Sequence, residues 1–188
     1  MRLVLASGSP RRLELLRQIS VTPDAVVATD IDETPRPDEA PRALALRLAL
    51  GKAQACPADD AVVLAADTVV ACGRRLLGKA ESEDEARRWL TLLSGRAHQV
   101  ITGVAVRAPG AVMRHRTVLT RVRFARLGSA DIESYVASGE WRGKAGAYGI
   151  QGRAERFVTA LNGSYSNVVG LPLQETAFLL RAAGVVVP

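Results

Sequence analysis

The stretch 61–68 reads Ala-Val-Val-Leu-Ala-Ala-Asp-Thr, six apolar residues followed directly by an aspartate and a threonine. A short, wholly apolar run predicts a strand that is buried on both faces, at the centre of a sheet. We expect Asp67 and Thr68 to break this strand, so that Asp67 stands at its end. Ligands of open α/β sheets bind beyond strand ends, which makes Asp67 a candidate metal ligand or general base for water. A turn-forming aspartate is the structural alternative.

The segments around this strand alternate between strand and helix patterns, and strand patterns dominate the middle of the chain. Strands are predicted at 2–6, 25–29, 69–71, 99–106 and 117–124, with extended segments at 148–150 and 156–158. Helices are predicted from Pro10, at 41–55, from Ser82 with a Ser-x-x-Glu capping box, at 129–135 and at 173–183. The 188 residues therefore predict an α/β fold with a mixed sheet, as one domain or one core with two lobes.

Composition restricts the function classes. The formal net charge is +6, which favours a polyanionic partner. Because the basic residues are scattered and aromatic residues make up only 4%, a nucleotide is favoured over nucleic acid as that partner. No stretch is long and apolar enough for a membrane span, and two cysteines are too few for a disulfide framework. We expect a cytoplasmic protein.

The lysines form a pattern of their own. Only Lys52, Lys79 and Lys144 interrupt a chain that otherwise uses arginine as its cation, and each stands in a Gly-Lys-Ala tripeptide. Lysine offers a compact point charge where arginine offers a planar fork. The three lysines are therefore candidate phosphate contacts, with chance in a small sample as the alternative.

The turn 7–12 reads Ser-Gly-Ser-Pro-Arg-Arg and joins the first strand to the first helix. Ser9 suits the N-cap and Pro10 the first helical position. The backbone N–H groups of such a helix start favour an anion. Arg11 and Arg12 oppose the helix dipole there, at a cost of about 0.3–1 kcal/mol each, which a bound phosphate would offset. Ser7, Arg11 and Arg12 are thus candidate phosphate contacts, unless this is an ordinary cap with solvated arginines.

Two loops carry further polar candidates. The acidic loop 30–33 includes Glu33. Its carboxylates are either solvated or bind Mg²⁺ or Mn²⁺, since both ions prefer oxygen ligands. The segment 73–80 has nearly the spacing of a phosphate-binding P-loop, but Ala80 lacks the hydroxyl that such a loop requires. We predict instead a turn between short strands that brings Lys79 to the site.

The segment 144–152 is rich in glycine and alanine. Its glycines predict a close approach of the backbone to another group. That group is either a ligand, with Gln151 pairing its amide to a base edge, or the protein itself in a tight bend.

Taken in order, these segments resemble the Maf family of nucleotide pyrophosphatases over nearly the whole chain. The resemblance is carried by 6–12 (Ala-Ser-Gly-Ser-Pro-Arg-Arg), 32–34 (Asp-Glu-Thr), 51–53 (Gly-Lys-Ala), 66–70 (Ala-Asp-Thr-Val-Val), 93–100 (Leu-Ser-Gly-Arg-Ala-His-Gln-Val), 144–152 and 163–172. It implies a curved mixed sheet flanked by helices, with a central cleft between two lobes, often in a homodimer. It also implies Asp67 as catalytic base, a divalent metal (Mg or Mn) near Glu33 and Asp67, and phosphate contacts from Arg11, Arg12, Lys52 and Lys79.

The substrate expectation follows from the branch of the family. Arg11, Thr68 and Gln151 match the branch similar to dTTP/UTP pyrophosphatases, whereas a branch preferring 7-methyl-GTP differs there. Ala80 and Gly143 stand where the family often has proline and aspartate, and the second departure leaves the role of Lys144 open. We expect cleavage of dTTP, UTP or modified pyrimidine nucleotides to the monophosphate and pyrophosphate. The alternatives are a preference for 7-methyl-GTP and a nucleotide-binding regulator of cell division that acts without hydrolysis.

Overall fold

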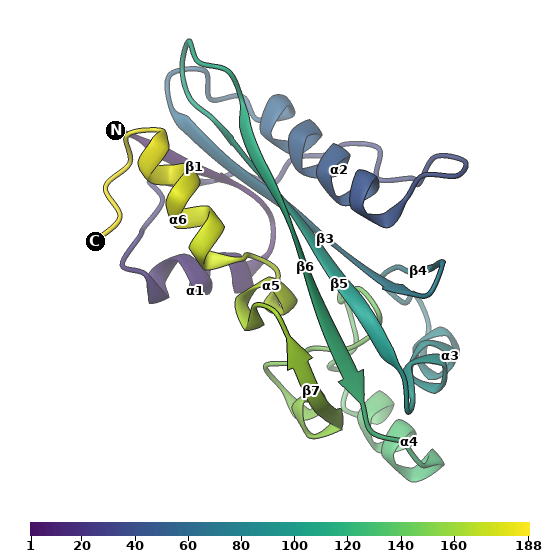
Figure 1. The fold of residues 1–188 in the computed structure, drawn as a ribbon. Helices are drawn as coiled ribbons and strands as arrows, with labels where there is room; N and C mark the ends of the chain where they lie inside the picture. The colour runs from purple at the N-terminus through teal and green to yellow at the C-terminus, as the bar shows by residue number, and fades with distance from the viewer. The chain divides into compact units, whose positions relative to one another are not determined.

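The computed structural model describes residues 1–188 and contains a seven-stranded sheet in the order β2-β1-β3-β5-β6-β7, with β4 paired to β3 (Figure 1). β1 pairs in parallel with β2 and β3, whereas β4 pairs antiparallel with β3, and β7 with β6. The strands are β1 (Leu3–Ala6), β2 (Ala25–Val26), β3 (Val62–Cys72), β4 (Arg75–Leu77), β5 (Ala97–Arg107), β6 (Arg114–Phe124) and β7 (Val158–Asn162). The predicted mixed α/β sheet is confirmed.

Six α-helices and one 3-10 helix accompany the sheet. They are α1 (Pro10–Gln18), α2 (Pro41–Ala55), α3 (Glu83–Leu93), α4 (Ser129–Ala137), η1 (Arg153–Phe157), α5 (Tyr165–Val169) and α6 (Leu173–Ala182). None of them has the length and apolar character needed to cross a membrane. The chain divides into two compact units, the first formed by 1–67, 102–118 and 170–188, and the second by 68–101 and 119–169.

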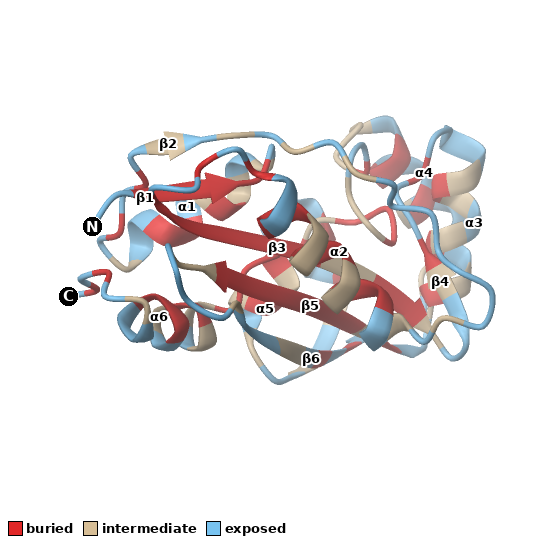
Figure 2. Ribbon diagram, turned by 90° about the horizontal axis from the view of Figure 1, so that it is seen from above, coloured by how far each residue is buried: buried red, intermediate tan, exposed pale blue.

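The core of the first unit lies between α2 and the sheet. Ala49 and Ala53 of α2 belong to one buried cluster with Val4 of β1 and Val63 of β3, and Figure 2 shows α2 over the buried strands β3 and β5. The contact is close, because a Cβ atom at Gly103 would stand 2.3 Å from the carbonyl oxygen of Ala45. Helices α1 and α6 lie on the side of the sheet away from α2 (Figure 1).

In the second unit, α3 begins as its sequence predicts. The Oγ of Ser82 accepts a hydrogen bond from the backbone N–H of Glu85 at 3.2 Å. The Glu85 carboxylate, however, accepts from the N–H of Glu81, so only half of the predicted capping box forms. The expected inner face of Ala86, Leu90 and Leu93 is buried.

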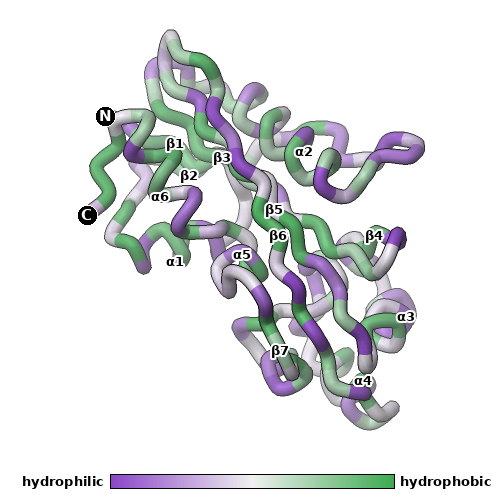
Figure 3. Tube along the Cα trace, in the orientation of Figure 1, coloured by the Kyte–Doolittle hydropathy of each residue, from purple (hydrophilic) through white to green (hydrophobic).

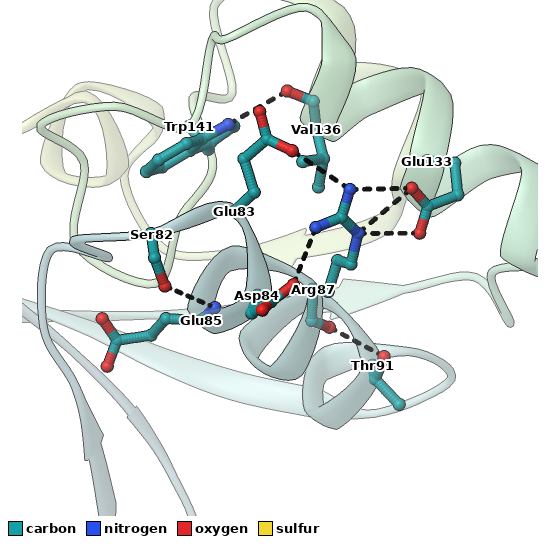
Figure 4. Close-up of polar contacts among 9 residues, drawn as sticks. All are labelled: Ser82, Glu83, Asp84, Glu85, Arg87, Thr91, Glu133, Val136 and Trp141. Carbon is teal, nitrogen blue, oxygen red and sulfur yellow. Dashed lines mark hydrogen bonds and ion pairs between the residues drawn. The ribbon is translucent and has the colours of Figure 1, made fainter.

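Arg87 joins α3 to α4 (Figure 4). Its guanidinium bonds Glu133 of α4 as well as Glu83 and Asp84 of its own helix, at 2.9–3.1 Å. These hydrogen bonds raise the pKa of Arg87, with Glu133 as the main cause. Since the carboxylates are exposed, such a network fixes the two helices in register more than it stabilises the fold.

Polar and apolar residues alternate along β6 (Figure 3). Thr120, Val122 and Phe124 are buried, whereas Arg121 and Arg123 between them are exposed. This confirms the predicted two-residue period of the strand.

Several sequence predictions were wrong. β3 is not broken at Asp67 and Thr68 but continues through them to Cys72. Its pairing with β1 ends at Ala65 and its pairing with β4 starts at Val70, while β5 is also its neighbour, so the backbone stays extended. Residues 148–150 form no strand, and η1 covers 156 and 157 of the expected extension at 156–158, so that only Val158, the first residue of β7, is in a strand. β2 is shorter than expected, and α5 was not predicted.

Candidate active site

The turn after β1 is held by hydrogen bonds among its own residues. Ser7 is buried, and its Oγ accepts hydrogen bonds from the backbone N–H of Ser9 at 3.2 Å and from Nη1 of Arg12 at 2.9 Å. α1 begins at Pro10 with Ser9 as N-cap, as predicted, but the Ser9 side chain makes no capping bond. The first turn of α1 also lacks an acidic residue. This helix start therefore keeps the features that favour an anion.

Arg12 connects this turn to a distant segment of the same unit. Its Nε donates to the carbonyl oxygen of Gly170 at 2.8 Å while Nη1 holds Ser7. Burial lowers the pKa of Arg12, and the nearby Asp67 carboxylate opposes that shift. Arg12 thus fixes the shape of the turn and adds a buried positive charge to it.

The centre of the first unit's polar cluster is Lys52, in the last turn of α2. Its Nζ lies 2.5 Å from Oδ1 of Asp67 and 2.5 Å from Oε1 of Glu33. Lys52 and Asp67 are each 8% exposed, whereas the Glu33 side chain is 45% exposed. A buried ammonium therefore stands between two carboxylates, one buried and one facing solvent.

This arrangement is suited to a divalent cation. A buried charge is costly unless it is paired, and here two carboxylate oxygens converge on one positive group. Mg²⁺ is commonly held by one or two protein carboxylates together with phosphate oxygens and water. No group of three or more His, Cys, Asp or Glu side chains is placed to hold a metal ion. A cation at Glu33 and Asp67 would therefore take its other ligands from substrate and water.

The sequence motifs have a counterpart among known proteins. A family model described as Maf-like protein matches residues 2–183. The chain belongs to the Maf family. It is 64% identical to a protein of Hyphomonas neptunium named dTTP/UTP pyrophosphatase, over 97% of this chain and 95% of the relative. It is 60% identical to a protein of the same name from Caulobacter vibrioides, with the same coverage of both chains.

Among solved structures, the Staphylococcus aureus Ham1 protein resembles this Maf-family chain with a TM-score of 0.46 and 17% identity. The match covers 66% of this chain and 72% of the other. Because this similarity is low, the fold is assigned from the strands and helices of the chain itself.

The structure brings together most of the predicted site residues of this Maf-family chain within the first unit. Arg11 is half-buried beside Arg12, and its pKa is lowered by burial, with Glu14 opposing the shift. The carbonyl of Gly170 was not foreseen as a contact, although the resemblance had marked its segment 163–172. The gathered residues are Ser7, Arg12, Glu33, Lys52 and Asp67.

Thr68, Lys79 and Gln151 belong to the second unit. Thr68 follows Asp67 directly on β3, and Gln151 is exposed in a turn. Lys79 forms an isolated bridge with Ala145, so two of the three Gly-Lys-Ala tripeptides lie side by side. The predicted turn is present between β3 and β4, but only β4 is short. That this turn brings Lys79 to the site stays a prediction.

The glycines of 144–152 lie against the protein's own side chains. A Cβ at Gly149 would stand 2.6 Å from Cε of Lys144, and one at Gly152 would stand 2.1 Å from Oε2 of Glu140. The Nζ of Lys144 donates to the backbone carbonyl of Glu140. Lys144 and Glu140 thus fill the space beside these glycines, and the contact of Gln151 with a base edge stays a prediction.

His98 anchors the same segment from a buried position. Its Nε2 lies 2.8 Å from the Tyr148 hydroxyl, and both rings make edge contacts with Phe124. Burial lowers the pKa of His98 to about 4 and raises the pKa of Tyr148. Both groups are therefore neutral at physiological pH, and the contact is a neutral hydrogen bond. The sequence marked His98 only as part of the 93–100 segment.

Proposed function

We propose that this chain hydrolyses pyrimidine nucleoside triphosphates, dTTP or UTP, to the monophosphate and pyrophosphate. The observation that carries the proposal is the buried Lys52 ammonium held 2.5 Å from both Asp67 and Glu33. Such a set of charges serves phosphoryl chemistry, which depends on positioning and electrostatic stabilisation. The relatives named dTTP/UTP pyrophosphatase support the substrate assignment.

The triphosphate anion binds at the turn 7–12. The start of α1 offers backbone N–H groups, and Ser7 and Arg12 hold the turn rigid. Arg11 contacts a phosphate, and Lys52 moves from its carboxylates toward the phosphate oxygens to neutralise their charge. From the family resemblance we infer that Lys79 also contacts a phosphate, that Gln151 pairs with the pyrimidine edge, and that Thr68 contributes to substrate binding.

Asp67 is the general base. It accepts a proton from a water molecule, whose oxygen forms a bond to the α-phosphorus while the bond from that phosphorus to the bridging oxygen breaks. The pyrophosphate leaves with the bridging oxygen, and the monophosphate keeps the oxygen of the water. Glu33 and Asp67 would hold a divalent cation, Mg²⁺ or Mn²⁺, which supplies positive charge to the phosphate oxygens when bound.

Two expectations remain: a homodimer, from the family resemblance, and a cytoplasmic location, from the composition. Both stay predictions. A regulator that binds nucleotide without hydrolysing it is the alternative function, and it is tested by the same experiment.

The test is pyrophosphate release from dTTP, UTP, CTP, ATP, GTP and 7-methyl-GTP with Mg²⁺ or Mn²⁺, for the wild type and Asp67→Asn. Asparagine keeps an oxygen that accepts from Lys52, so the fold should persist while turnover drops about 10²–10⁴-fold. Asp60→Asn, at an exposed aspartate, is the control and should be fully active. An active Asp67→Asn enzyme would refute the assignment of the base. Nucleotide binding without release from any substrate would favour the regulator.

A further inference from the structure

A second charged region lies within the second unit. It is an open groove of about 780 Å³, lined by Ser94, Gly95, Arg96, Arg123, Phe124, Ala125, Arg126, Thr159 and Ala160. We call it the arginine groove. None of these residues belongs to the phosphate, metal or base-edge contacts proposed above.

The groove concentrates uncompensated positive charge. Arg96, Arg123 and Arg126 are exposed, and none of their guanidiniums forms an ion pair or hydrogen bond with another side chain or carbonyl. No aspartate or glutamate lines the groove. Elsewhere in the chain, arginines such as Arg47 and Arg107 are bonded to carboxylates. Three unpaired guanidiniums in one concave surface repel one another, and an anionic ligand would reduce that repulsion.

The backbone beneath the groove is held in place. The N–H of Gly95 donates to the carbonyl of Ala125 at 2.9 Å, and the N–H of Phe124 donates to the carbonyl of Arg96 at 3.0 Å. The Thr159 hydroxyl donates to the carbonyl of Arg123 at 3.2 Å. Gly95 has φ +69°, a conformation that suits glycine at this turn. The three arginines thus project from segments whose backbones are hydrogen-bonded to one another, so the floor of the groove is fixed before a ligand arrives.

The chemistry of the groove selects among anions. The guanidinium fork matches two oxygens of a phosphate, and three such groups suit two or three linked phosphates better than one. The volume falls in the range of small-molecule sites. The one aromatic residue, Phe124, is 1% exposed, so no ring is offered for stacking a base or a single strand.

We propose that the arginine groove binds a polyphosphate group of two or three phosphates. That group is found in free inorganic pyrophosphate or tripolyphosphate and in the tail of a nucleoside triphosphate. The groove would act as an anion site in addition to the one at the turn 7–12.

The test compares three proteins by calorimetric titration with inorganic pyrophosphate and tripolyphosphate, without nucleotide or metal. The groove variant carries Arg96→Ser, Arg123→Ser and Arg126→Ser. The control variant carries Arg17→Ser, Arg74→Ser and Arg88→Ser, which removes the same charge from exposed arginines outside the groove. We expect the groove variant to lose one binding event, with affinity lowered about tenfold or more for each guanidinium. The control should keep that event, and thermal melts should show all three proteins folded.

Binding that is equal in the wild type and the groove variant would overturn the proposal, as would an equal loss in both variants. The proposal would also be overturned, in favour of nucleic acid, if the groove variant lost affinity for a 20-base-pair DNA duplex but bound polyphosphate as the wild type does. Titration of UTP into Asp67→Asn, with and without the groove changes, separates the two sources. If the groove binds UTP more tightly than tripolyphosphate, its ligand is the nucleotide. If it binds tripolyphosphate more tightly, its ligand is the free anion. None of these titrations depends on hydrolysis, so their failure is distinguishable from failure of the proposed function.

Discussion

Replacing Lys52 with methionine tests the electrostatics of the cluster directly. Methionine keeps an unbranched side chain of similar reach but removes the ammonium that lies 2.5 Å from Asp67 and from Glu33. Asp67, 8% exposed, then keeps a buried charge without its closest partner. Removing one member of a buried ion pair typically costs about 3–5 kcal/mol. Losing the contact with Glu33 adds little to this cost, because the exposed Glu33 carboxylate can be solvated by water instead.

We therefore expect Lys52→Met to lower the free energy of unfolding by about 3 kcal/mol, measured by urea denaturation. For a chain of this size the melting temperature should fall by about 6–12 °C. Lys79→Met, at an exposed lysine, is the control and should change stability far less. The double variant Lys52→Met with Asp67→Leu should recover part of the loss, because position 67 then carries no unpaired buried charge, although Arg12 loses its nearby carboxylate. The reasoning fails if Lys52→Met is as stable as the wild type, or if the double variant is no more stable than the single one.

Two further predictions concern packing and pH. Gly103→Ala should destabilise the fold by about 1–3 kcal/mol, because its Cβ would stand 2.3 Å from the Ala45 carbonyl oxygen. Gly78→Ala, with no atom within 4 Å, should melt close to the wild type, and equal melting of both variants would contradict the packing argument. His98 has a pKa of about 4 when folded, against 6.5 for an unperturbed histidine, so the unfolded chain binds more protons between these values. Stability should therefore fall as pH drops from about 6.5 to about 4, by up to about 3 kcal/mol. His98→Asn should lack that part of the pH dependence in urea titrations, and identical pH profiles would argue against it.

Much of the fold could be predicted because local patterns determine it. The helix predicted at 41–55 matches α2 at both ends, since Pro41 opens it and apolar residues recur at helical spacing. The alternation in β6 and the inner face of α3 have the same origin. The break predicted in β3 was wrong because β3 runs on through Asp67 to Cys72 beside β5, a neighbour that local sequence does not reveal.

The site was predicted through residue types and order more than through geometry. The occurrence of all three lysines in Gly-Lys-Ala tripeptides predicted that they have specific sites. Lys52 does lie between two carboxylates. Lys144, in the same tripeptide, instead lies over Gly149 and bonds a backbone carbonyl. The bond from Arg12 to Gly170 spans 158 positions, and no local pattern encodes a partner at that distance.

The Lys52 cluster also determines how charge is balanced before any nucleotide binds. Glu33 and Asp67 contribute two negative charges, and Lys52, Arg12 and the adjacent Arg11 contribute three positive ones, so the resting site carries a formal charge of only +1. A triphosphate then arrives as an excess of negative charge that the cluster cannot absorb alone. Nucleotide binding is therefore thermodynamically linked to the uptake of cations from solution, and the affinity for substrate should rise and fall with their concentration.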